Sequence, residues 1–168
     1  MNAIDRLCPH CGLCCDGSLF ADVELKLGDD SKRLTQLGLA LAKKGKRKLA
    51  FVQPCACFDG KHCKVYPDRP RQCRLFECGV LKKTGAGKIR VETALEIISE
   101  AKTLANRVRT HLRTFRQRPD EQPMPRCYSE AMSAPIDLSS NDDEGQRRGQ
   151  LMQAYGDLME LLEREFLR

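Results

Sequence analysis

The sequence predicts a small α+β protein, in which a cysteine-knuckle core with short strands is followed by an α-helical hairpin. Three observations predict this fold class. Nine of the ten cysteines lie in the first 78 of 168 residues, short alternating apolar segments lie among them, and two later segments repeat apolar residues every three or four positions. We therefore expect a cysteine-cluster domain over residues 1–90 and a helical extension over residues 91–168 that packs on it.

The composition limits the classes of function. Apolar residues make up 41% of the chain, aromatic residues only 5%, and Trp is absent, so a nucleic-acid platform of aromatic side chains is poorly supplied. No stretch approaches the roughly 18 apolar residues of a membrane span. The first fifteen residues also lack the continuous apolar segment of a secretory leader. We expect a soluble, cytoplasmic protein without a membrane partner.

The first half is expected to alternate short strands with one helix. Residues 18–27 (SLFADVELKL) alternate apolar and polar side chains, which predicts a strand. Asp30 or Ser31 can cap a helix, and the leucine spacing after them predicts that helix over about 31–44. The basic run KKGKRK then ends the helix, and LAFVQP predicts a second short strand.

The second half is expected to be mainly helical. The segment KIRVE (88–92) alternates and predicts a short strand that pairs with an earlier one. Thr93 and Glu96 form the S/T-x-x-E capping box, which opens a long helix that runs to about Arg118. Residues 119–144 contain four prolines and predict an irregular connection. The periodic segment 151–166 predicts a terminal helix.

The cysteine spacing predicts a metal site, with a disulfide framework as the alternative. In a reducing compartment, clustered thiols are more often metal ligands than disulfide partners. Cys8-x-x-Cys11-x-x-Cys14 supplies three ligands in succession, with Gly12 helping the turn to close. This spacing is typical of a [4Fe–4S] cluster with a remote fourth cysteine, whereas zinc ribbons use two separated pairs. Because neighbouring side chains diverge, Cys15 beside Cys14 indicates more than one metal atom.

The chain resembles a known family at these cysteines. CxxCxxCC at residues 8–15, followed by CACFDGKHCKVYPDRPRQCRLFEC at 55–78, is similar to the CxxCxxCC cysteine-cluster family, also called the YkgJ-like family, of zinc- or iron-chelating domains. The resemblance implies eight thiolate ligands: Cys8, Cys11, Cys14, Cys15, Cys55, Cys63, Cys73 and Cys78. Cys57 and Cys127 stay outside this set and are expected to behave as small buried hydrophobes. His10 and His62 are weaker ligand candidates than the thiols.

The YPDRP segment is expected to support the site. Tyr66 can pack against the cysteine knuckle, and Arg69 and Arg74 can donate to thiolate sulfur or neutralise its charge. The expected cofactor is an iron–sulfur cluster, with [4Fe–4S] favoured by the spacing, or zinc, in a structural or redox role. Two Cys₄ zinc sites, one cluster with spare thiols, and a cluster plus one zinc all stay open at this point.

The strongest competing function is nucleic-acid binding. The segment 102–118 carries six cations and no acid, which are Lys102, Arg107, Arg109, Arg113, Arg116 and Arg118. With KKGKRK, this segment could make the protein a metal-stabilised nucleic-acid module. We favour the alternative that the acidic terminal helix, with Asp157 and Glu160, packs antiparallel against this helix and matches its charges.

An enzymatic role is the less favoured prediction. The sequence shows no catalytic triad, paired carboxylates or phosphate-binding loop. The resembled family includes a flagellin lysine methylase, but that enzyme is much longer and this chain lacks a Gly-rich nucleotide turn. A methylase or redox accessory role therefore stays a remote alternative. A protein partner stays open.

Overall fold

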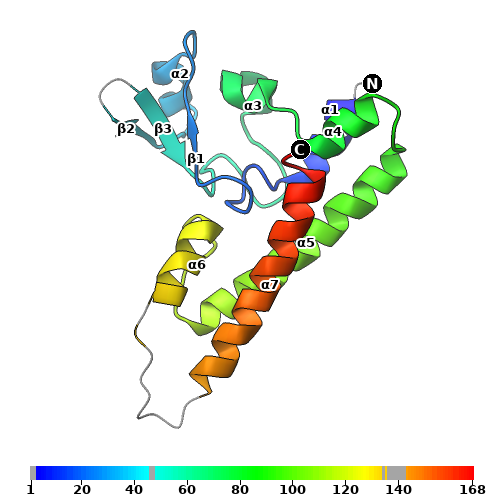
Figure 1. Cartoon of the computed structure of the whole chain (residues 1–168). Coiled ribbons are helices and arrows are strands. Elements are labelled where there is room, and N and C mark those ends of the chain that lie inside the picture. Colours follow the sequence, from blue (N-terminus) through cyan, green and yellow to red (C-terminus); the bar gives the residue numbers. More distant parts are fainter. Residues whose placement is uncertain (1–2, 46–47, 134, 136–142) are drawn as a thin grey trace.

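The structure is a computed structural model that describes residues 3–45, 48–133, 135 and 143–168. The described part contains a three-stranded antiparallel sheet, several short helices and two long helices (Figure 1). The predicted α+β class is confirmed. None of the helices in the described part combines the length and apolar character that crossing a membrane requires.

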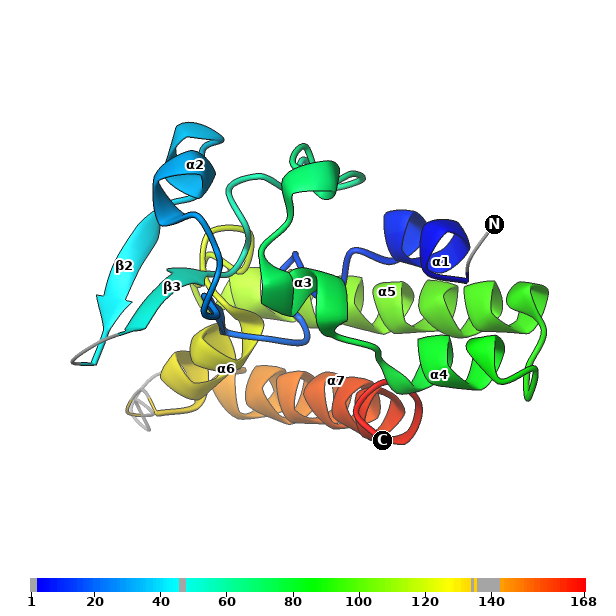
Figure 2. The same cartoon turned by 90° about the horizontal axis from the view of Figure 1, so that it is seen from above.

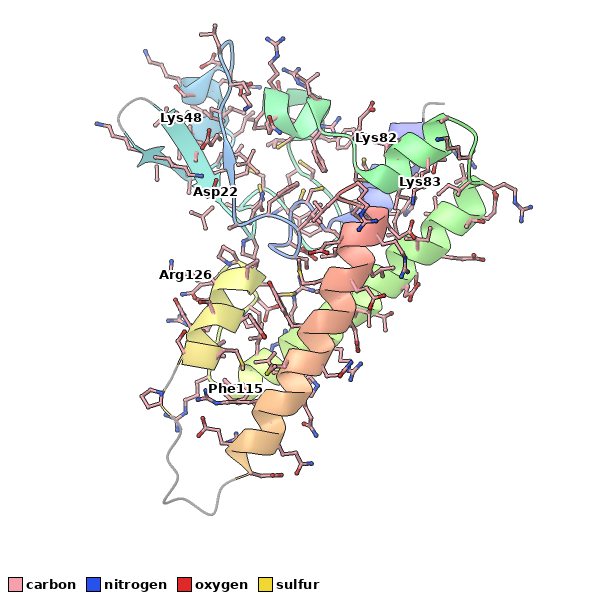
Figure 3. All side chains as sticks on the ribbon, in the orientation of Figure 1. Asp22, Lys48, Lys82, Lys83, Phe115 and Arg126 are labelled. Carbon is pink, nitrogen blue, oxygen red and sulfur yellow. The ribbon has the colours of Figure 1, made fainter. Side chains whose placement is uncertain are left out.

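The sheet is formed by short strands in the order β1-β3-β2, all antiparallel. Strand β1 spans Asp22–Glu24, β2 spans Leu41–Lys44 and β3 spans Lys48–Val52. Phe51 in the central strand is opposite both Val23 and Leu41, so apolar side chains share one face. On the strands, the Lys44 ammonium lies 2.6 Å from Asp22, which Figure 3 labels together with Lys48.

The predicted helix over 31–44 is wrong in its second half. Helix α2 covers only Ser31–Gln36, and its first turn is capped as expected, because the Asp30 carboxylate accepts from the N–H of Arg33 at 3.0 Å. Gly38 has a φ of +101°, outside the helical region, so the chain turns there and enters β2. The leucines that predicted one long helix therefore belong to a short helix and then to a strand.

The predicted strands are only partly confirmed. LAFVQP forms β3, as expected, but residues 18–27 contribute just three residues to the sheet. Leu27 is 97% exposed, so it cannot share the buried face of Val23. Within KKGKRK, Lys43 and Lys44 belong to β2 and Lys48 to β3, while residues 46–47 lie outside the described residues.

Short helices carry much of the cysteine-rich half. Helix α1 spans Ala3–Cys11, the 3₁₀ turn η1 spans Tyr66–Asp68, α3 spans Arg71–Leu75 and α4 spans Gly79–Gly85. Two long helices follow, α5 over Val91–Thr114 and α7 over Glu144–Glu165. They lie side by side and run antiparallel (Figures 1 and 2), so the predicted helical hairpin is confirmed, with α6 in the connection that joins its two helices.

Three sequence predictions around α5 and α6 are wrong. No strand forms over residues 88–92, because α5 begins at Val91 and Ile89 packs on the helical core instead. The helix therefore starts before the predicted capping box at Thr93, and Arg90 is its N-cap residue. In the predicted irregular connection, Met124–Ser133 form helix α6, while residues 136–142 lie outside the described residues. The number of prolines predicted an irregular segment, but prolines are tolerated in the first turn of a helix.

The interior divides into a large helical core and a small sheet core. The large core contains nineteen buried residues of the described part and joins Leu7 and Leu13 to α4, α5, α6 and α7. The small core contains six: Val23, Leu34, Leu39, Phe51, Cys57 and Val65. Helix α3 lies between the sheet on one side and helices α1 and α4 on the other (Figures 1 and 2). The predicted domain boundary near residue 90 stays a prediction.

Candidate metal centre

One cavity collects the cysteines that the sequence singled out. Its volume is about 440 Å³, and it lies where α1, the 55–63 loop, α3 and the start of α4 meet. Side chains from these elements fill the region between the sheet and the long helices, and sulfur atoms are visible there (Figure 3). All eight predicted ligands line the cavity: Cys8, Cys11, Cys14, Cys15, Cys55, Cys63, Cys73 and Cys78. All eight are half-buried and free of disulfides.

The remaining two cysteines lie elsewhere. Cys57 is 2% exposed in the sheet core, where its thiol donates to the carbonyl of Leu37 at 3.4 Å. Cys127 is fully buried in the helical core. Neither lines the cavity, so both act as small apolar side chains of the interior.

The turn that follows Gly12 fixes the first cysteine segment. Gly12 has a φ of +77°, and a Cβ built on it would lie 2.6 Å from Cζ of Phe58. Its carbonyl accepts from the N–H groups of Cys15 and Asp16 at 2.8 and 3.0 Å. A glycine is required here for both the backbone conformation and the close approach of Phe58.

Backbone hydrogen bonds join the first segment to the second. The N–H of Cys55 donates to the carbonyl of Cys15 at 2.8 Å, so the two chain segments lie side by side at these cysteines. Farther along, Phe58 and Cys63 form an isolated antiparallel bridge. The Asp59 carboxylate stabilises the intervening turn by accepting from the N–H of His62 at 2.7 Å. The CFDGKHC segment is therefore a tight hairpin that returns Cys63 to Cys55.

The cavity cysteines pack against different cores. Cys8, Cys11 and Cys78 lie against the helical core, because α1 and α4 contact each other and α5. By contrast, three other cavity cysteines lie against the sheet core: Cys55, Cys63 and Cys73. The Cys14–Cys15 pair lies at the end of the segment that leaves α1 and meets the 55–63 loop.

The thiols nearest the helical core influence one another electrostatically. Burial raises the pKa of the Cys11 thiol to about 12, and the nearby Cys78 and Cys8 add to that increase. Burial also raises the pKa of Cys14 well above its usual value, with smaller increases from Cys11, from Cys15 and from those same two thiols. These effects require the thiols to lie close together.

The thiols nearest the sheet core form a second such set. Burial raises the pKa of Cys15, and the thiols of Cys55, Cys63 and Cys73 raise it further. Burial raises the pKa of Cys73 to about 12, again with contributions from Cys55 and Cys63. A metal ion would supply the positive charge that makes buried thiolates stable.

Only some of the residues that were expected to support the site line the cavity. The Arg69 guanidinium carbon lies 3.5 Å from the centroid of the Tyr66 ring, and its Nε donates to the Tyr66 carbonyl at 2.9 Å. Both side chains line the cavity, and the Arg69 charge acts to lower the pKa of Cys73, opposing its burial. Arg74 and His10 are absent from the cavity wall, whereas His62 is part of it.

The thiols share a cavity without forming a closed coordination shell. Within the described part of the chain, no three or more His, Cys, Asp or Glu side chains are already spaced to hold a metal ion. Metal–sulfur bonds of about 2.3 Å therefore require the thiols to turn towards a common centre. The donor set itself fits zinc or an iron–sulfur cluster, because both bind clustered thiolates.

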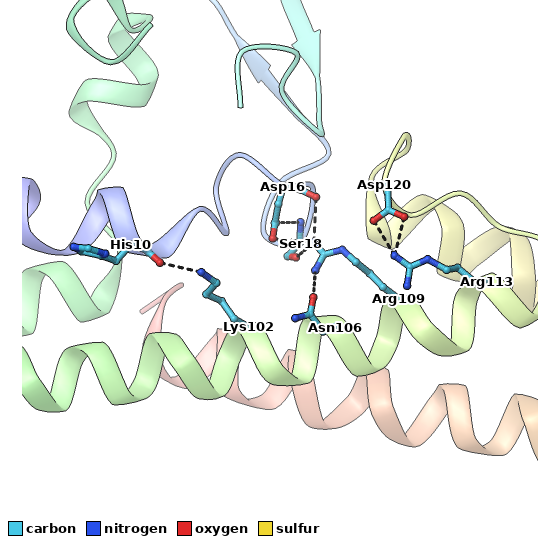
Figure 4. A network of polar contacts seen from close by, with 8 residues as sticks. All are labelled: His10, Asp16, Ser18, Lys102, Asn106, Arg109, Arg113 and Asp120. Carbon is cyan, nitrogen blue, oxygen red and sulfur yellow. Dashed lines mark hydrogen bonds and ion pairs between the residues drawn. The ribbon is translucent and has the colours of Figure 1, made fainter. Parts of the chain in front are cut away.

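Basic residues of α5 hold the first cysteine segment, which the sequence did not indicate (Figure 4). Arg109 is only 10% exposed, and its Nη2 lies 2.8 Å from Oδ2 of Asp16 and 2.9 Å from Oγ of Ser18. About two turns earlier in α5, the Lys102 ammonium donates to the carbonyl of His10 at 3.1 Å. The helix that looked like a phosphate-binding surface thus supports the CxxCxxCC turn.

Comparison with known proteins agrees with this arrangement. Eight half-buried thiols around one cavity, on a small α+β fold, define a cysteine-cluster protein of the metal-chelating type. The chain belongs to the CxxCxxCC family, described as "Putative zinc- or iron-chelating domain", whose model matches residues 7–97. The resemblance found in the sequence is confirmed, and family membership supports metal binding in general. No curated protein and no solved structure matches the chain.

Proposed function

We propose that this protein chelates an iron–sulfur cluster or zinc through its eight cavity thiolates. The observation that supports the proposal best is that these eight cysteines, drawn from residues 8 to 78, line one cavity while Cys57 and Cys127 do not. Thiols scattered over the surface, or joined as cystines, would have argued against a metal. Iron and sulfur come first, because the C-x₂-C-x₂-C spacing is that of cluster-binding proteins.

The metal would have a structural role and, if it is an iron–sulfur cluster, a redox role as well. Small domains often draw their folding free energy from metal binding, and the sheet core of six buried residues is small for independent stability. Arg69 would support the site by facing Cys73 and offsetting the charge of the thiolates. Reduced, metal-binding thiols also suit a cytoplasmic location.

The nucleic-acid alternative receives no support from the contacts of α5. Several of its cations have acidic partners: Arg107 with Asp157 at 3.0 Å, Arg109 with Asp16 at 2.8 Å and Arg113 with Asp120 at 2.8 Å. Cations already paired with carboxylates have less charge to offer phosphates. Helix α5 therefore serves the packing of the molecule.

The test is anaerobic purification followed by metal and acid-labile sulfide analysis. Iron with equimolar sulfide and a visible absorbance that bleaches on reduction would support an iron–sulfur cluster, and stoichiometric zinc without sulfide would support zinc. A Cys57→Ala/Cys127→Ala variant is the matched control and should keep the full metal content, because both side chains lie outside the cavity. Wild-type protein without stoichiometric metal would overturn the proposal.

A further inference from the structure

Six of the eight thiols divide into two trios by the core against which they pack. Cys8, Cys11 and Cys78 contact the helical core through α1 and α4. Cys55, Cys63 and Cys73 contact the sheet core through the 55–63 hairpin and α3. The two trios therefore pack against different cores, which limits how closely the thiols of one trio can approach those of the other.

The adjacent Cys14 and Cys15 complete the two sets. Side chains of neighbouring residues diverge, so two adjacent cysteines are poorly placed to bind a single ion. The carbonyl of Cys15 is hydrogen-bonded at 2.8 Å to the N–H of Cys55, which places Cys15 with the second trio. Since Cys15 lies with the second trio and neighbouring side chains diverge, Cys14 belongs with the first trio, at the end of the segment that leaves α1.

Each completed set has the composition of a whole metal site. Four thiolates fill the shell of a tetrahedral zinc ion and hold one [4Fe–4S] cluster. Each set also has a cation in its own segment, since Lys82 follows Cys78 by one turn of α4 and Arg69 lines the cavity four residues before Cys73. A nearby cation offsets part of the negative charge that four thiolates bring to a site.

We propose that the protein carries two separate four-thiolate centres that share only the Cys14–Cys15 peptide. The helix-side centre consists of Cys8, Cys11, Cys14 and Cys78. The sheet-side centre consists of Cys15, Cys55, Cys63 and Cys73. This inference rests on the proposed metal-binding function and excludes one cluster with spare thiols.

The first test compares two double variants, each purified without oxygen and analysed for metal and sulfide. Cys8→Ala/Cys78→Ala removes half of the helix-side ligands, and Cys55→Ala/Cys73→Ala removes half of the sheet-side ligands. Each variant should lose the metal of one centre, which is a twofold drop where both centres hold the same metal group, and the combined variant should lose all of the metal. The Cys57→Ala/Cys127→Ala control should keep the wild-type content. A metal-free wild type contradicts the proposed function itself, whereas a single variant that keeps all its metal contradicts only the division.

The second test uses the wild-type chain and so does not depend on how the variants fold. Metal-free reduced protein is titrated with one equivalent of Cd²⁺ alone and treated with a thiol-alkylating reagent, and the protected cysteines are mapped by mass spectrometry. Species that hold one ion should protect four cysteines, all from the helix-side centre or all from the sheet-side centre. A protected set of four cysteines drawn from both centres would overturn the division, as would protection of all eight thiols by one ion. This test also decides the matter if both double variants lose all their metal.

Discussion

Arg109 shows how one side chain connects the helical half to the cysteine cluster. It reaches from the last third of α5 to Asp16 and Ser18, directly after the Cys14–Cys15 pair. An arginine that is 10% exposed needs partners for its charge, and these residues provide them. The sequence placed Arg109 among six cations of a basic helix but could not show that its partner lies 93 positions earlier.

We predict that Arg109→Met destabilises the protein far more than Arg107→Met does. Removing Arg109 leaves the largely buried Asp16 carboxylate without its ion pair, and we expect a loss of about 2 kcal/mol in the free energy of unfolding. Arg107 is the matched control on the same helix, because its pair with Asp157 is 48% and 34% exposed and should contribute below about 1 kcal/mol. Urea denaturation of both metal-loaded variants measures the difference, and equal losses would contradict the role given to Arg109.

At the scale of elements, the start of α4 is where the C-terminal helix contacts the cysteine cluster. Gly79 follows Cys78 directly, and its N–H donates to the carbonyl of Phe166 at 2.9 Å, beyond the end of α7. A Cβ at this position would collide with the carbonyl oxygens of Glu165 and Arg168. The end of α7 can therefore approach Cys78 only because residue 79 has no side chain.

We predict that Gly79→Ala lowers stability by about 1–3 kcal/mol, because the backbone at the end of α7 must move away. Gly85→Ala, at the opposite end of α4, is the control: an added Cβ there meets nothing within 4 Å, so stability should be unchanged or rise slightly. Thermal denaturation gives the comparison, and metal analysis shows whether displacement of α7 also weakens binding at Cys78. A Gly79→Ala variant as stable as Gly85→Ala would mean that α7 does not pack on α4 as described.

The elements that the sequence predicted well are those whose side chains repeat on one face. Helices α5 and α7 bury residues such as Ile98, Ala105 and Leu158 at helical spacing, and that spacing is visible in the sequence. Helices α1 and α3 were missed because their short segments carry cysteines, whose positions are set by the cavity that they line, and the short helix α4, which begins directly after Cys78, was missed with them. The second half of the predicted helix at 31–44 failed because Gly38, with its positive φ, redirects the chain into a strand.

At the scale of the whole molecule, the thiol-lined cavity lies between a large core and a small one. The family resemblance predicted all eight cysteines that line the cavity, because their spacing along the chain can be recognised in the sequence. The sequence could not predict which core each cysteine packs against, because this depends on how α1, the 55–63 hairpin and α4 pack in space. Only the Cys14–Cys15 pair indicated more than one metal atom beforehand.

We predict that metal removal loosens the sheet half and leaves the long helices folded. The helical core holds nineteen buried residues of the described part, whereas the sheet core holds six and is tied to the rest partly by the cysteine segments. A core of six side chains, each contributing about 1.5–3 kcal/mol, is too small to order its segment alone. Far-UV circular dichroism of chelator-treated, reduced protein should therefore keep most of its helical signal.

Limited proteolysis locates the effect along the chain. In the metal-free protein, cleavage should concentrate between residues 22 and 76, at bonds that the metal-loaded protein protects, while the paired helices α5 and α7 resist. Restoring the metal under reducing conditions should restore the protection, because the thiolates again join the 55–63 hairpin to α1 and α4. Cleavage spread evenly over α5 and α7, or a metal-free protein as resistant as the loaded one, would mean that the centres do not hold the two cores together.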